Sequence, residues 1–119
     1  MTVTLDGKTL TVLEWSDNFI GISTKWMSWS SGGAKPKVAA YGYDNTITLH
    51  CVENGVTWAN SVVPYFRDKM ASGAIIVLVS DETVRVFSSA NVCVIGVSED
   101  ILDIGTNNIR HYALVLQEL

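Results

Sequence analysis

The two histidines and two cysteines are the side chains best suited to bind a metal ion or to act as a catalytic base or nucleophile. His50 and Cys51 are adjacent in a strand-like run, so they point to opposite faces and cannot bind the same metal ion. Cys93 and His111 could meet across neighbouring strands, but these two side chains alone do not complete a zinc site. The sequence contains no CxxC, HExxH, GxSxG or phosphate-loop pattern. We therefore predict no catalytic residues, no metal site and no cofactor, and we expect that the protein is not an enzyme.

Acidic residues cluster at 99–103 and at 81–82. The first cluster lacks the alternating ligands and the distal glutamate of a calcium-binding loop, and the second falls where a turn favours aspartate. Both clusters predict solvated turns rather than sites.

Aromatic residues offer a different chemistry, which is contact with a partner. Trp26 and Trp29 come just before a stretch rich in Ser, Gly and Lys at residues 30–37, which predicts a long hairpin loop that can reach a neighbouring subunit. The alternative is that one tryptophan lies in the core and the other covers the base of its own loop. The predicted partner or subunit interface consists of Trp26, Trp29, Gly32, Gly33, Lys35 and Lys37.

Other aromatic residues could stack on a sugar ring or a peptide. Tyr41 and Tyr43 share one face of a predicted strand, and Trp15 closes the first predicted hairpin, where we expect it to be half-buried. Trp58 belongs to the apolar stripe around the predicted helix, so we expect it in the core. Trp15, Tyr41 and Tyr43 therefore favour a second hypothesis, a small carbohydrate- or peptide-binding β module.

The elements that must position these residues are mostly strands. Residues 2–5 and 8–14 alternate in polarity around Asp6-Gly7, which predicts a hairpin with a type I′ turn. Residues 46–52 alternate in the same way and predict a strand, whereas residues 19–29 show no clean period.

A helix is predicted at about residues 61–72. Ser61 is a suitable N-cap and Gly73 a suitable residue after the C-terminus. With this start Pro64 lies in the first turn, where its missing N–H costs nothing. A start near Thr57 would instead place Pro64 in the interior and kink the helix.

The second half returns to strands. Residues 74–79 are apolar at every position, which predicts a strand covered on both faces, and a turn is predicted at residues 80–82. Further strands are predicted at 83–87, 91–98 and 109–119, with a loop at 99–108. This order predicts a single domain over residues 1–119 of the α+β class, with a mainly antiparallel β-sheet, sandwich-like or barrel-like, packed with one α-helix.

Composition narrows the function classes. Of the 119 residues 48% are hydrophobic and 17% are charged, which excludes disorder, and the net charge of −4 argues against sequence-specific binding of nucleic acid. No apolar run is long enough for a membrane helix, so we predict no membrane partner. The low charge is typical of a subunit with large interfaces, although a neutral β domain coated with Ser and Thr would have it too.

Residues 56–119 also resemble a known group of proteins. They combine the helix SVVPYFRDKM, the strand NVCVIGVS and the closing strand IRHYALVLQEL. This series resembles small structural proteins of bacteriophage tails, of the tail-completion or terminator, tail-tube and distal-tail group. The resemblance implies a structural role in a virion, usually as a symmetric ring.

The leading hypothesis is therefore a non-enzymatic structural subunit of a virion or phage-tail-like assembly. We expect it to form a homo-oligomer through sheet edges and residues 26–37, and to bind other virion or tail proteins. We expect the host cytoplasm during assembly and then the virion as its location. In that compartment Cys51 and Cys93 should remain buried thiols.

Overall fold

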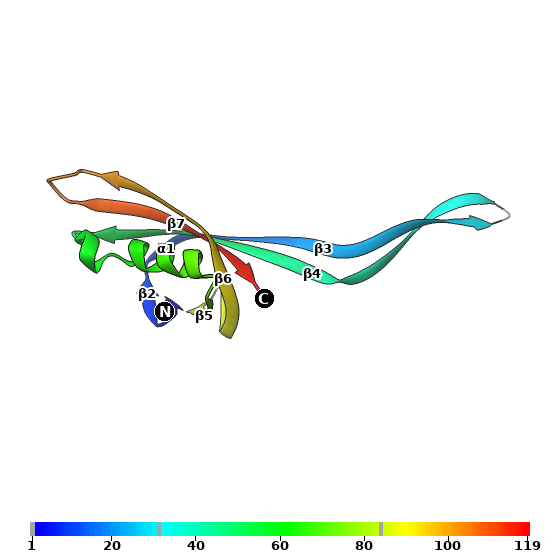
Figure 1. Ribbon diagram of the computed structural model, residues 1–119, viewed down its shortest axis with the longest axis horizontal. Helices are drawn as coiled ribbons and strands as arrows, with labels where there is room; N and C mark the ends of the chain where they lie inside the picture. The colour runs from blue at the N-terminus through cyan, green and yellow to red at the C-terminus, as the bar shows by residue number, and fades with distance from the viewer. Residues whose placement is uncertain (1, 31, 84) are drawn as a thin grey trace.

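The computed structural model describes residues 2–30, 32–83 and 85–119, without the side chains of Ser28, Ser30, Tyr41 and Phe87. The described chain forms seven strands, one α-helix and one 3₁₀-helix (Figure 1). The strands are β1 (Val3–Leu5), β2 (Lys8–Leu10), β3 (Val12–Ser30), β4 (Gly33–Asn54), β5 (Ile75–Glu82), β6 (Arg85–Leu102) and β7 (Ile109–Glu118). The helices are η1 (Trp58–Asn60) and α1 (Val62–Ser72).

The strands form one sheet in the order β2-β1-β5-β6-β7-β4-β3, and every pairing between the described strands is antiparallel. Helix α1 packs mainly against β6 (Figure 1). The α+β class, with a mainly antiparallel sheet and one α-helix, is confirmed.

The core forms where alternating strand residues meet the helix. On β4 the side chains of Ile47, Leu49 and Cys51 are buried and His50 is exposed, which confirms the alternation predicted for this strand. Helix α1 adds Val63 and Phe66 to the same core. The other buried apolar residues are Val3, Leu5, Leu10, Ile76, Leu78, Val92, Val94, Tyr112, Leu114 and Leu116.

Local sequence signals fix two elements as predicted. Asp6 and Gly7 have φ of 51° and 76°, as a type I′ turn between β1 and β2 requires. Ser61 is the N-cap of α1, where its hydroxyl accepts a hydrogen bond from the Val63 N–H at 3.1 Å. Gly73 ends the helix in the left-handed conformation with φ of 67°.

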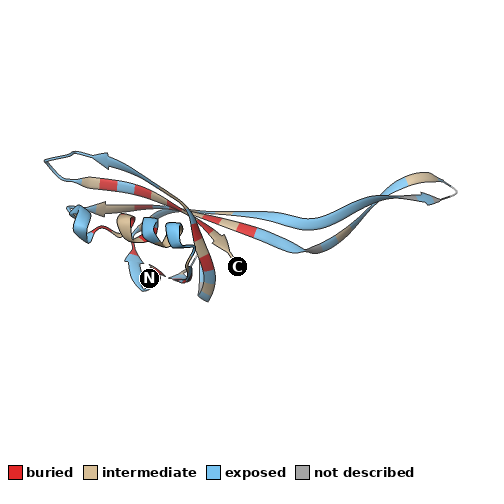
Figure 2. Cartoon of the chain, viewed as in Figure 1, coloured by how far each residue is buried: buried red, intermediate tan, exposed pale blue. Residues whose placement is uncertain are grey.

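Strands β3 and β4 continue far beyond the core as a two-stranded ribbon, which we call the arm (residues 19–30 and 33–44). The described chain extends 73 Å along its longest axis, and its radius of gyration of 19.4 Å exceeds the ~13.5 Å expected for a compact chain of this length. Buried residues occupy only the body of the molecule, and exposed and intermediate residues make up the arm (Figure 2).

The predicted loop at residues 30–37 is therefore wrong. Strand β3 extends to Ser30 and β4 begins at Gly33, so the ladder continues through the pairs Trp29–Ala34 and Ser30–Gly33. Ser31 lies outside the described residues. The glycine and serine residues therefore form only the tip of the arm. Lys35, Pro36 and Lys37 pair with β3, since a strand whose other edge is open tolerates proline.

The prediction of a strand covered on both faces at residues 74–79 is also wrong. The side chains of Ile75 and Val77 on β5 are 65% and 41% exposed, whereas Ile76 and Leu78 are buried. Alternate residues of a strand point to opposite faces, so only one face of β5 contributes to the core.

Strand β6 joins segments that the sequence predicts to be separate. The predicted turn at residues 80–82 is wrong, because these residues pair with residues 85–87. The predicted strands at 83–87 and 91–98 are mostly parts of β6, which also includes residues 99–102 of the predicted loop. Strand β6 pairs with β5 through its first half and with β7 through its second half. One long strand is therefore needed to link the two parts of the sheet.

Candidate functional site

The arm exposes apolar side chains along its whole length. Trp29 near the tip is 82% exposed and Trp26 is 48% exposed, so the alternative that one of them lies in the core is wrong. The other large apolar residues exposed on the arm are Phe19, Ile20, Ile22, Met27, Val38 and Tyr43. Exposed apolar surface on a folded protein often marks a site of interaction with another protein.

The distal arm is also positively charged. Residues 22–41 contain Lys25, Lys35 and Lys37 and no acidic residue, and all three lysines are exposed. Gly32 and Gly33 lie at the tip beside them, and Gly33 has φ of 102°, a conformation that favours glycine. The structure thus brings the six predicted interface residues together on one end of the molecule.

The backbone of the arm adds open edges to this surface. Strand β4 pairs with β7 only from Thr46 to Asn54, and β3 is the last strand of the sheet. Within the described arm each strand therefore pairs only with the other and leaves one edge unpaired. Open edges of this kind can pair with another chain.

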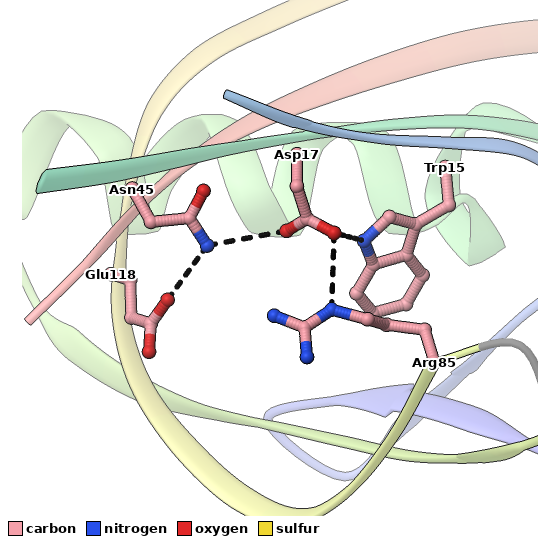
Figure 3. Close-up of polar contacts among 5 residues, drawn as sticks. All are labelled: Trp15, Asp17, Asn45, Arg85 and Glu118. Carbon is pink, nitrogen blue, oxygen red and sulfur yellow. Dashed lines mark hydrogen bonds and ion pairs between the residues drawn. The ribbon is translucent and has the colours of Figure 1, made fainter. Parts of the chain in front are cut away.

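A polar cluster fixes the base of the arm to the body (Figure 3). The Asp17 carboxylate accepts hydrogen bonds from Trp15 Nε1 at 3.1 Å and from Asn45 Nδ2 at 3.2 Å, and it forms an ion pair with Arg85 Nε at 3.0 Å. Asn45 also donates to Glu118 Oε2 at 2.7 Å. These contacts join β3 and β4 to β6 and β7 where the arm leaves the core.

At the end of the body opposite the arm lies a cavity of about 320 Å³, which we call the end pocket. Its apolar lining includes Trp58, Ile101 and Ile104, which are 44%, 43% and 76% exposed. The prediction that Trp58 lies in the core is therefore wrong, because this residue belongs to η1 and precedes the helix. The Arg110 guanidinium lies over the Trp58 ring, 5.5 Å from its centroid.

Ion pairs and hydrogen bonds hold the end pocket in shape. Arg110 pairs with Glu53 at 2.6 Å and with Glu99 at 2.9 Å, and only 9% of its side chain is exposed. The Gly55 N–H donates to the Asn108 carbonyl at 3.1 Å, which ties the end of β4 to the loop between β6 and β7. The end pocket thus lies between the segment that follows β4 and the loop between β6 and β7.

Two of the candidate stacking residues, Trp15 and Tyr43, lie too far apart to share one platform. Trp15, which is half-buried as predicted, lies at the base of the arm, and Tyr43 pairs six residues further along β3, about 20 Å away. Tyr43 contacts Phe19 edge-on, with ring centroids 5.3 Å apart. The side chain of Tyr41 lies outside the described structure. A ligand-stacking role for these residues stays a prediction.

The thiols and imidazoles are dispersed. Cys93 lies opposite Gln117 and His111 opposite Asp100, so the two are about 20 Å apart along the β6–β7 ladder. Both cysteines are free, but Cys93 is only partly buried. Burial raises the pKa of the Cys51 thiol to about 12, so it stays protonated. The described residues hold no group of three or more His, Cys, Asp or Glu residues that could bind a metal ion.

Comparison with known proteins adds evidence at the level of fold. No protein-family model matches the sequence, and no curated protein is similar to it. Solved structures do match. A chain in the virion of a native gene transfer agent particle has a TM-score of 0.62 at 13% identity, with 99% of this chain and 89% of that chain covered.

Two further solved structures are also similar to this chain. A chain in the tail of an empty gene transfer agent particle has a TM-score of 0.62 at 14% identity, with 99% of this chain and 90% of that chain covered. The terminating cap of the anti-feeding prophage tube gives 0.53 at 14% identity, with coverages of 98% and 82%. This chain has the fold of virion and tail-tube-cap proteins. The resemblance inferred from residues 56–119 is confirmed for the fold and extends to the arm.

Sequence reasoning missed both the base cluster and the end pocket. Asp17 and Arg85 are 68 residues apart, and no local pattern links them. The end pocket had a weak signal, because Ile101, Leu102 and Ile104 are apolar residues within a segment that otherwise predicts a solvated loop. In the described residues no helix has the length and apolar character needed to cross a membrane.

Proposed function

We propose that this protein is a non-enzymatic structural subunit of a virion or phage-tail-like assembly that self-associates into a ring or another oligomer. The observation that carries the proposal is the arm, a long ribbon with many exposed apolar side chains, none of whose described side chains belongs to the core. The shared fold supports it, because the three similar chains come from a virion, a tail and a tube cap.

The free energy of association should favour burial of the arm against another chain. Burial of one large apolar side chain contributes about 1.5–3 kcal/mol, and the arm exposes eight such residues in the free chain. Pairing at the open edges of β3 and β4 would add main-chain hydrogen bonds to a neighbouring chain. The arm is therefore suited to a subunit whose exposed apolar side chains and open strand edges are covered by neighbouring subunits.

The partners and the location of the subunit follow from this proposed role. Copies of this chain and other tail or virion proteins are the partners, and neither a membrane nor a specific nucleic-acid sequence is among them. The net charge of −4 fits a wall that nucleic acid does not bind tightly. Assembly in a host cytoplasm would precede incorporation into the virion.

The test is the mass of the full-length protein in solution. We expect sedimentation velocity and native mass spectrometry to show oligomers that grow with concentration from micromolar to millimolar. The double variant Trp26→Lys/Trp29→Lys should remain monomeric, whereas Ile75→Lys, at an exposed position on β5, should associate like the wild type. A wild-type protein that stays monomeric throughout this range would overturn self-association.

A further inference from the structure

We propose that the tip of the arm of one copy docks through Trp29 into the end pocket of a second copy. The inference rests on the proposed function, because it names the contact through which copies of the chain join. It assigns the end pocket to a protein partner, a second copy of this chain, rather than to a small ligand.

Size and chemistry make the end pocket a suitable site for an aromatic anchor. Its volume of about 320 Å³ is at the low end of the range for ligand sites. Trp58, Ile101 and Ile104 form apolar walls, and the stacked Arg110 guanidinium closes one side. Among the described large apolar side chains Trp29 is the most exposed, so it loses little intramolecular contact when it docks. Tryptophan in a desolvated pocket is a typical hot spot of an interface.

The charges on the two surfaces are complementary. The distal arm contains only positive charges, on Lys25, Lys35 and Lys37. Beside the end pocket, residues 95–109 contain Glu99, Asp100 and Asp103 and no basic residue. Glu99 is already paired with Arg110, and Asp100 points to the face of β6 opposite to the pocket residue Ile101. Asp103, which is exposed and next to Ile104 in the loop between β6 and β7, is therefore the carboxylate available to an incoming arm. Opposite charges on two surfaces favour encounter and fix orientation.

The two surfaces lie at opposite ends of the molecule. In Figure 1 the arm extends to one end of the long axis, and the β6–β7 loop and the start of α1 lie at the other. With a long axis of 73 Å, the arm cannot reach the end pocket of its own chain. The contact is therefore head to tail between copies, which generates a ring if the rotation closes.

Mixing two variants tests this contact. Trp29→Ala removes the anchor and Ile104→Glu blocks the pocket, and both residues are too exposed to be needed for folding. Each variant alone should associate at least about 30-fold more weakly than the wild type, as loss of a hot spot implies. An equimolar mixture should form heterodimers that cannot grow, because one copy supplies an intact arm and the other an intact pocket. Ile75→Glu is the matched control and should associate like the wild type.

Charge reversal provides an independent measurement. Lys35→Glu/Lys37→Glu should weaken association, and mixing with Asp103→Lys should restore it as mixed oligomers, because the arm of each variant then meets the opposite charge at residue 103 of the other. If the wild type associates but Ile104→Glu associates equally well, or if neither mixture restores association, the docking contact is overturned and the proposed function stands. A wild type that remains monomeric overturns the proposed function itself.

Discussion

The Asp17 carboxylate lies 3.0 Å from Arg85 Nε, and this ion pair joins β3, at the base of the arm, to the first residue of β6. Its two side chains are 18% and 32% exposed, so solvent screens the pair only in part. Because Asp17 also accepts hydrogen bonds from Trp15 and Asn45, its loss removes three contacts of this cluster at once.

Asp17→Ala should therefore lower the free energy of unfolding by about 1–3 kcal/mol. Asp17→Asn should cost less, because an amide oxygen can still accept one hydrogen bond. Urea unfolding followed by tryptophan fluorescence measures both. The control is Asp68→Asn on the exposed side of α1, which should change stability by less than about 0.5 kcal/mol. An Asp17→Ala variant as stable as the wild type would show that the cluster does not stabilise the base.

The cap of α1 gives a second prediction. The Ser61 hydroxyl accepts from the Val63 N–H and donates to Glu53, so Ser61→Ala should cost about 1–2 kcal/mol by thermal or urea unfolding. Ser61→Thr keeps a capping oxygen and should retain most of the stability. Ser72→Ala, in the exposed last turn, is the neutral control. Equal losses for the alanine and threonine variants would contradict the capping role.

Close packing at Gly96 gives a third prediction. A Cβ at this position would lie 3.3 Å from both Cβ and Cγ2 of Val115 on β7. Gly96→Val should therefore destabilise the protein by about 1–3 kcal/mol, and Val115→Ala in the same chain should recover part of that loss.

The matched control for this position is Gly21→Val on the arm. A Cβ there meets nothing within 4 Å, so this substitution should be neutral or slightly stabilising. Additive effects of Gly96→Val and Val115→Ala in a double-mutant cycle would refute the contact.

The thiols give a fourth prediction. The pKa of Cys51 is raised to about 12 by burial, so at pH 8 its reactive thiolate is scarce and inaccessible. The native protein should react with a thiol reagent at about one site per chain, Cys93, and at two sites after unfolding. Cys93→Ser should abolish the fast reaction and Cys51→Ser should leave it unchanged. Rapid modification of Cys51 in the native state would contradict its burial.

Local signals explain which parts of the fold could be predicted from the sequence. Ser61, Pro64 and Gly73 define the helix through the chemistry of its ends, and the alternation at residues 46–52 is imposed by a core on one face. The arm has no such constraint, because neither face of its ribbon is buried in the chain, so residues 19–29 show no period. The base cluster depends on the pairing of distant strands, which no window of sequence contains.

The length of the arm has a mechanical consequence. No other described strand pairs with the arm (residues 19–30 and 33–44). The ribbon therefore acts as a lever whose fulcrum is the Asp17 cluster. A small rotation at the fulcrum displaces Trp29 far more than it displaces any core residue. In the assembly proposed above, the polar contacts at the fulcrum would thus set the pitch and curvature, although they lie far from the proposed contact surface.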